Sequence, residues 1–91
     1  MKTARVRTKK GVIEVELLLS EGKIEQISLT GDFFVYPEDS LEQFENSLIG
    51  VPINKEALSE VIAAFYSKQQ FLTPGITVED WVTVIFQAAN S

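Results

Sequence analysis

Hydrophobic and polar residues alternate along the first third of the chain, as they do in strands with one buried face. The alternation is clearest over residues 12–20, where the apolar positions are Ile13, Val15, Leu17 and Leu19. A weaker alternation over residues 3–9 precedes it, and another over about residues 23–30 follows the turn pair Glu21-Gly22. A Gly-containing pair between two such runs is typical of a tight hairpin. The pattern therefore predicts a meander of three antiparallel strands.

Charged residues on the first two predicted strands suggest how these strands pair. Arg5 and Arg7 lie on the polar face of the first strand, and Glu14 and Glu16 lie on the polar face of the second. Opposite charges across a strand pair contribute about 0.2–1 kcal/mol each. We therefore expect Arg5 and Arg7 to lie opposite Glu14 and Glu16.

Helical spacing replaces the alternation after the first third, beginning with the apolar residues Leu41, Phe44, Leu48 and Ile49. Pro37 suits the first turn of this helix, and Ser40 with Gln43 predicts a capping box at its start. Gly50 is the expected stop, because glycine is favoured just past a helix end.

Capping residues predict the starts of two further helices. Asn54 is the expected N-cap of the second helix, whose buried stripe is predicted to be Leu58, Val61, Ile62 and Phe65. Thr77 caps the third helix, Asp80 is favoured in its first turn by the helix dipole, and Ile76 with Trp81 predicts a hydrophobic staple. The inner face of this helix is predicted to be Trp81, Val84, Ile85 and Ala88.

The order of these elements predicts an α+β fold: a three-stranded antiparallel meander sheet followed by three helices packed on one face, β-β-β-α-α-α. A chain of 91 residues, 45% of them hydrophobic, is expected to form a single domain over residues 1–91. So small a domain buries only about 60–65% of its unfolded surface, and a partner surface would add to its marginal stability.

The composition excludes most kinds of catalytic and metal site, since the chain has no cysteine and no histidine. Disulfides, thiolate metal sites and Cys nucleophiles are excluded, and the commonest metal ligand and general base is missing. The carboxylate pairs Glu14 with Glu16 and Glu79 with Asp80 lie on polar faces or at a helix cap, and no glycine-rich phosphate loop occurs. We therefore predict no catalytic residue, no metal site and no cofactor bound by this chain alone.

The charge is unevenly distributed. Residues 1–10 hold five basic residues and no acid, whereas residues 11–91 hold three basic and thirteen acidic residues, a net charge of −10. A nucleic-acid binder needs a basic surface, so we expect no nucleic-acid partner and interpret the basic start as a solvated edge strand. No apolar run approaches the ~18 residues of a membrane span, and no signal core follows the start. A cytoplasmic location without membrane association is the expectation.

One segment, from Gly31 to Pro37, places three aromatic residues within four positions between a strand end and a helix start. In one interpretation it is a corner whose phenylalanines fill the core. In the other, part of the cluster faces a partner, because aromatic residues anchor protein interfaces. Both can hold, since neighbouring side chains point in different directions. The candidate interface residues are Gly31, Asp32, Phe33, Phe34, Tyr36 and Pro37.

Five short runs add a signal of another kind: Gly11-Val-Ile-Glu-Val, Glu21-Gly-Lys-Ile, Gly31-Asp-Phe-Phe with Tyr36-Pro37, Leu48-Ile-Gly-Val-Pro, and Pro74-Gly-Ile-Thr-Val-Glu-Asp-Trp. In this order and spacing, over about residues 9–89, the chain resembles the C-terminal accessory domain of lipoate–protein ligases. The Gly-Asp-Phe-Phe corner and the Leu-Ile-Gly run are the more specific parts of the resemblance.

The resemblance implies a function that the residues alone do not show. Lipoate–protein ligases use ATP to form lipoyl-AMP and transfer the lipoyl group to a lysine of acceptor proteins, such as 2-oxoacid dehydrogenase E2 subunits and the glycine-cleavage H protein. Lipoate, ATP and Mg are then expected on a separate catalytic subunit, with this chain as its accessory partner in a heterodimer. The alternative hypothesis is an independent module that binds a small ligand or a peptide and has no role in ligation.

Overall fold

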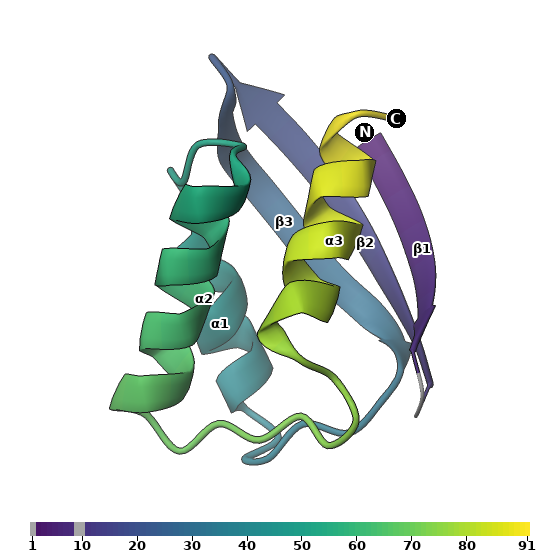
Figure 1. Cartoon of the computed structure of the whole chain (residues 1–91), viewed down its shortest axis with the longest axis vertical. Helices are drawn as coiled ribbons and strands as arrows, with labels where there is room; N and C mark the ends of the chain where they lie inside the picture. The colour runs from purple at the N-terminus through teal and green to yellow at the C-terminus, as the bar shows by residue number, and fades with distance from the viewer. Residues whose placement is uncertain (1, 9–10) are drawn as a thin grey trace.

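The computed structural model of the protein describes residues 2–8 and 11–91. The strands are β1 (Lys2–Thr8), β2 (Gly11–Ser20) and β3 (Lys23–Asp32), and the helices are α1 (Ser40–Leu48), α2 (Lys55–Lys68) and α3 (Val78–Ala89). The strands form an antiparallel sheet in the order β1-β2-β3, with the helices on one side of it (Figure 1). The predicted α+β fold is thereby confirmed. Lys9, the predicted end of the first strand, and Lys10 lie outside the described residues.

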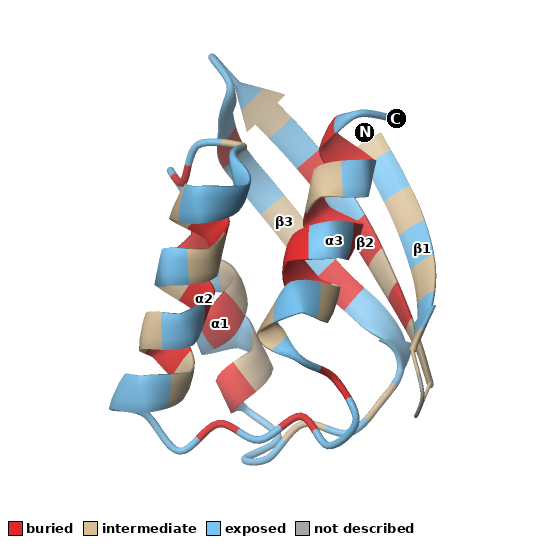
Figure 2. Cartoon of the chain, viewed as in Figure 1, coloured by how far each residue is buried: buried red, intermediate tan, exposed pale blue. Residues whose placement is uncertain are grey.

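The helices form two layers over the sheet. Helix α3 packs against β1 and β2, and α1 packs beside β3. Helix α2 packs against α1 and α3 and, within the described part of the chain, its backbone does not come close to that of any strand. Figure 2 shows buried residues on the facing sides of the helices and the sheet. The sheet therefore supports α1 and α3, and these two helices support α2.

The apolar face of the sheet is set by the alternation in β2 and by a bulge in its pairing with β3. Glu21 and Gly22 form the hairpin turn with positive φ angles of 52° and 77°. The register shifts between Leu18 and Leu19, which pair with Gln26 and Ile24, so the chain has one additional residue in β3. Such a bulge moves the next residues to the other face, and it turns Ile24, which the alternation alone did not place in the core, fully inward.

Only one of the two predicted ion pairs between β1 and β2 forms. Arg5 lies opposite Glu14, with 3.2 Å between Nε and Oε1. Arg7 lies opposite Val12, so the expectation for Arg7 and Glu16 was wrong. In an antiparallel pair, residue numbers rise along one strand as those of their partners fall along the other. With Arg5 opposite Glu14, Glu16 therefore lies opposite Thr3. The exposed Arg residues on the edge strand β1 agree with a solvated edge.

The caps of α2 and α3 are as predicted. Asn54 Oδ1 accepts a hydrogen bond from the Ala57 amide at 2.7 Å. Thr77 and Asp80 form a reciprocal capping box: the Thr77 hydroxyl accepts from the Asp80 amide at 3.1 Å, and the Asp80 carboxylate accepts from the Thr77 amide at 2.9 Å. These two helices begin where local hydrogen bonding dictates.

The predicted capping box of α1 is wrong. Ser40 is the first residue of the helix, and its buried hydroxyl donates to the carbonyl oxygen of Pro37. Asp39 holds the N-cap position and makes no side-chain capping bond. The Ser40 amide also donates to the Pro37 carbonyl, at 3.0 Å. The helix therefore begins after a turn that starts at Pro37, one residue earlier than a Ser40 cap requires.

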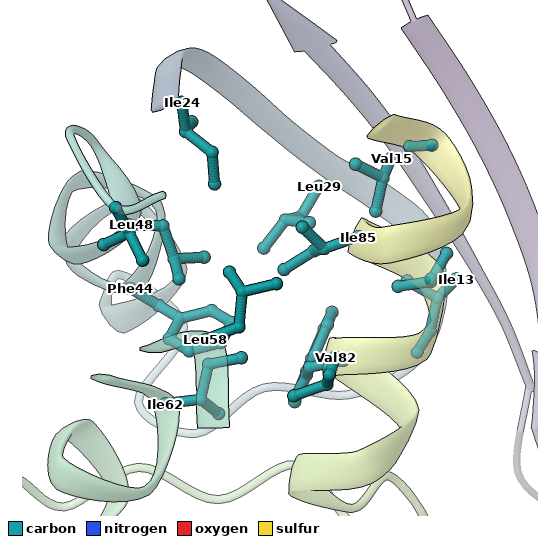
Figure 3. Packing of buried hydrophobic residues seen from close by; sticks show 14 of the residues in the cluster. Ile13, Val15, Ile24, Leu29, Phe44, Leu48, Leu58, Ile62, Val82 and Ile85 are labelled. Atoms are coloured by element: carbon teal, nitrogen blue, oxygen red, sulfur yellow. The ribbon is translucent and has the colours of Figure 1, made fainter. Parts of the chain in front are cut away.

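The core lies between the sheet and the three helices (Figure 3). Its fully buried aromatic residues are Phe44 and Trp81, whose ring centroids are 5.2 Å apart. Aliphatic residues from the strands and helices complete it, among them Ile13, Leu17, Ile24, Leu48, Leu58, Ile62 and Ile85. Burial of large aromatic side chains supplies much of the stability of so small a domain.

Gly31 is required by the close approach of β2 and β3. It has a φ of +138°, and a Cβ there would lie 2.1 Å from the Val12 carbonyl oxygen. We expect Gly31→Ala to lower the free energy of unfolding by about 2–4 kcal/mol, through backbone strain and the clash. Urea unfolding followed by circular dichroism measures this.

Gly22→Ala is the matched control for that experiment. Gly22 has a φ of +77°, but a Cβ there would meet nothing within 4 Å. This variant should lose only about 1–2 kcal/mol, the penalty of a left-handed conformation. A Gly31→Ala protein as stable as the Gly22→Ala protein would show that the strands separate easily at this point.

Candidate partner interface

Two loops lie side by side at the end of the molecule away from both termini (Figure 1). The first, residues 33–39, joins β3 to α1, and the second, residues 69–77, joins α2 to α3. The Tyr36 amide donates to the Leu72 carbonyl and the Leu72 amide donates to the Tyr36 carbonyl, both at 2.9 Å. This pair of backbone hydrogen bonds joins the two loops into one surface.

The two adjacent phenylalanines of the first loop point in opposite directions. The Phe33 ring packs edge-on against Trp81, with 5.5 Å between centroids. Phe34 is 69% exposed, and its ring lies nearly parallel to that of Tyr36, at 6.3 Å. Phe33 therefore packs against the core, as the first interpretation expects of it, whereas Phe34 does not. The exposure of Phe34 and Tyr36 leaves their rings available to a partner.

The exposed apolar side chains Phe34, Tyr36 and Leu72 together form what we call the end patch. They are 69%, 50% and 64% exposed. Leu72 was missed in the sequence, where Phe71 to Gly75 read only as a helix stop. The adjacent apolar pair Phe71-Leu72, like Phe33-Phe34, was the signal that could have found it, because one member is buried and the other exposed.

The other predicted interface residues surround the end patch or support it. Gly31 and Asp32 are the last residues of β3 and not part of the loop. Pro37 is exposed beside Tyr36. Tyr36 separates two shallow grooves, one of about 500 Å³ on the side of Phe34 and one of about 380 Å³ on the side of Pro37 and Leu72. The surface thus has a ridge between two hollows.

A series of hydrogen bonds connects the second loop to the helices on either side of it. The Trp81 Nε1–H donates to the Tyr66 hydroxyl oxygen at 2.8 Å. The Thr73 hydroxyl donates to the Ile76 carbonyl at 3.2 Å, so the Tyr66 hydroxyl donates to the Thr73 oxygen. Burial raises the pKa of Tyr66 above its usual 10.0, although its bonds to Thr73 and Trp81 act in the opposite direction. These hydrogen bonds fix the second loop to α2 and α3.

Replacing Tyr66 with Phe tests that support. The substitution leaves the Trp81 Nε1–H and the Thr73 hydroxyl without this partner, and we expect unfolding to require about 1–3 kcal/mol less. The raised pKa adds a pH dependence: above pH 10.0 the unfolded chain releases the Tyr66 proton more readily than the folded chain, so the stability of the unsubstituted protein falls there.

The measurement is urea unfolding at neutral pH and above pH 10, with Tyr36→Phe as the control because Tyr36 is half exposed. The Tyr66→Phe protein should not show the fall in stability above pH 10 that ionisation of Tyr66 causes. The Tyr36→Phe protein should still show it. Equal stability of both variants at neutral pH would mean that the hydrogen-bond chain adds nothing.

Three acidic side chains form contacts that support the fold itself. Glu14 pairs with Arg5, Asp80 caps α3, and a Glu45 carboxylate oxygen accepts from the Leu29 amide of the edge strand β3 at 2.7 Å. In residues 2–8 and 11–91 no three His, Cys, Asp or Glu residues gather as metal ligands do. Among the helices of this same part of the chain, none has the length and apolar character to cross a membrane.

A small α+β domain with an exposed apolar patch on two joined loops is typical of interaction domains. A family model described as bacterial lipoate protein ligase C-terminus matches residues 2–85, so the chain belongs to this family and the resemblance seen in the sequence is confirmed.

A curated relative and a solved structure that are similar to this chain both come from Thermoplasma acidophilum. Lipoate-protein ligase A subunit 2 is 39% identical over 79 residues, which are 87% of this chain and 81% of the relative. A chain from the structural analysis of an archaeal lipoylation system, a bi-partite lipoate protein ligase and its E2 lipoyl domain, superposes with a TM-score of 0.83 and 36% identity. That superposition covers 93% of this chain and 94% of the other.

Proposed function

We propose that this chain is the non-catalytic accessory subunit of a two-part lipoate–protein ligase, and that it binds a separate catalytic subunit and enables that subunit to form lipoyl-AMP. The observation that carries the proposal is the superposition with a chain from a bi-partite ligase, over 94% of that chain. The end patch supports it, since exposed aromatic residues serve as anchors in protein interfaces.

The role of the chain is to favour one conformation of its partner. Lipoate, ATP and Mg are held by the catalytic subunit, and the acceptors are lipoyl domains of E2 subunits and the glycine-cleavage H protein. A protein that binds the closed conformation more tightly than the open one shifts the equilibrium toward closure by its difference in affinity. Closure excludes water from the reacting groups and from a hydrolysable adenylate.

The aromatic corner from Gly31 to Pro37 is the proposed contact region. Gly31 and Phe33 set the shape of this region, because Gly31 allows β2 and β3 to approach and Phe33 packs on Trp81. Phe34 and Tyr36 present their rings outward, and Asp32 and Pro37 are also exposed. The heterodimer would bury these apolar rings and so add to the stability of a small domain.

Mixing the two subunits tests the proposal. Purified catalytic subunit is incubated with lipoate and Mg-ATP, with or without this chain, and lipoyl-AMP is measured by mass spectrometry. We expect adenylate from the mixture and little from either subunit alone. A catalytic subunit that forms lipoyl-AMP equally fast without this chain would refute the proposal.

Two controls separate activation from other roles. Supplying synthetic lipoyl-AMP to the catalytic subunit and an E2 lipoyl domain bypasses activation, so transfer should proceed without this chain. Gel filtration of the mixture should show a heterodimer. Separate elution, together with unchanged adenylate formation, is the result expected if the chain is instead an independent ligand- or peptide-binding module.

A further inference from the structure

We infer that the docking surface includes both loops, with Leu72 as a third anchor, and that it fits an apolar patch on the catalytic subunit that has basic residues along one side only. This inference rests on the proposed function and specifies the partner surface. Phe34, Tyr36 and Leu72 are three of the five large hydrophobic residues exposed in the described part of the chain. Isolated exposed hydrophobic residues are common, but such a cluster marks an interaction site.

The charges around the end patch determine the expected orientation of the partner. Between Lys23 and Lys55 the sequence has no basic residue, and its acidic residues on or next to the loop of Phe34 are Asp32, Glu38 and Asp39. Asp32 is exposed at the end of β3, and Glu38 and Asp39 are exposed on the loop that carries Phe34. Glu38 lines the groove beside the aromatic rings. A partner surface that faces this side is complementary if it is basic.

The residues around Leu72 do not share the acidic character of the Phe34 side. Gln69 and Gln70 line the groove beside Leu72, and Lys68 immediately precedes them in the sequence. Neutral amide side chains donate and accept hydrogen bonds without requiring a charged partner. The basic residues of the partner are therefore expected opposite Glu38 and not opposite Leu72, which fixes how the two proteins are turned relative to each other.

The end patch is held in shape before any partner binds. The Tyr36–Leu72 backbone pair joins the loops, and the chain from Trp81 through Tyr66 to Thr73 supports the second loop. A surface fixed in advance loses little conformational freedom on binding, so more of the contact energy contributes to affinity. Both termini lie at the other end of the molecule (Figure 1), so a terminal label for a binding experiment lies far from the patch.

The apolar part of the inference is tested with Leu72→Ala and the matched control Ile49→Ala. Ile49 is 45% exposed and lies outside the end patch, after α1. Titration calorimetry with the catalytic subunit should show the Kd of Leu72→Ala raised about tenfold or more, as for a central anchor. The Kd of Ile49→Ala should stay within about twofold of the unsubstituted value, as is usual away from such anchors.

The charge part is tested with Glu38→Lys and the control Glu60→Lys, an exposed position on α2. Glu38→Lys should slow association with the catalytic subunit and weaken its dependence on salt, because steering between opposite charges is lost. Glu60→Lys carries the same change in net charge and should have a smaller effect. Both substitutions are on the surface, so the test does not depend on a core change.

The outcomes separate the inference from the function on which it rests. If the unsubstituted chain neither binds nor activates a catalytic subunit, the proposed function and the inference both fail. If it binds and activates, but Leu72→Ala behaves as Ile49→Ala does or Glu38→Lys associates as fast as Glu60→Lys, only the inference fails. Weaker binding of both test variants than of their controls supports it.

Discussion

Replacing Phe34 and Tyr36 together with alanine is expected to reduce lipoyl-AMP formation by the mixed subunits about 100-fold, when both are present near the Kd of the unsubstituted pair or below it. The two rings are 69% and 50% exposed and stack on each other, so they are available to a partner as one anchor. Central aromatic anchors contribute about 2 kcal/mol each, and two of them, which are not strictly additive, correspond to roughly 100-fold in Kd.

The design separates docking from chemistry and from folding. A large excess of the double variant should restore the rate, because the substitutions weaken binding and remove no reacting group. The circular dichroism and the unfolding free energy should stay near those of the unsubstituted chain, since both rings are exposed. Leu18→Ala, at a position 37% exposed on β2, is the control and should leave the rate unchanged. An undiminished rate with the double variant would remove the end patch from the interface.

Features set by neighbouring residues could be predicted from the sequence. The alternation of β2, the Glu21-Gly22 hairpin and the caps Asn54 and Thr77 each depend on side chains a few residues apart. The inward turn of Ile24 could not be predicted, because it follows from a bulge in the pairing of two strands. Ser40 was misassigned since a preceding turn at Pro37 competes with the cap.

The candidate site likewise has a part that could be predicted from the sequence and a part that could not. The aromatic corner was recognisable because three aromatic residues within a short loop are unusual for a solvated connection. Which phenylalanine points outward depends on the position of Trp81, and Leu72 joins the surface only through its backbone bonds to Tyr36. Contacts between residues distant in sequence leave little local trace, so one of the three residues of the end patch, Leu72, could be recognised only in the folded structure.

Phe44→Ala is the substitution expected to destabilise the isolated chain most. Phe44 is fully buried, and rings from α2, α3 and the second loop surround it: Phe65, Tyr66, Phe71 and Trp81. Removing a buried phenylalanine ring costs about 3–5 kcal/mol, from lost burial and the cavity left behind. Native domains have only about 5–15 kcal/mol of stability, and a small one is near the lower limit. A large fraction of the variant should therefore be unfolded at 37 °C.

Thermal unfolding by circular dichroism measures the effect, with Phe34→Ala as the matched control for loss of a ring. Phe34 is largely exposed, so its loss should change the free energy of unfolding by less than about 0.5 kcal/mol. Because a partner that binds only the folded state stabilises it by mass action, excess catalytic subunit should raise the Tm of Phe44→Ala and have much less effect on that of Phe34→Ala. If instead both variants unfold at the same temperature, burial of the Phe44 ring among its aromatic neighbours adds nothing to the stability of the domain.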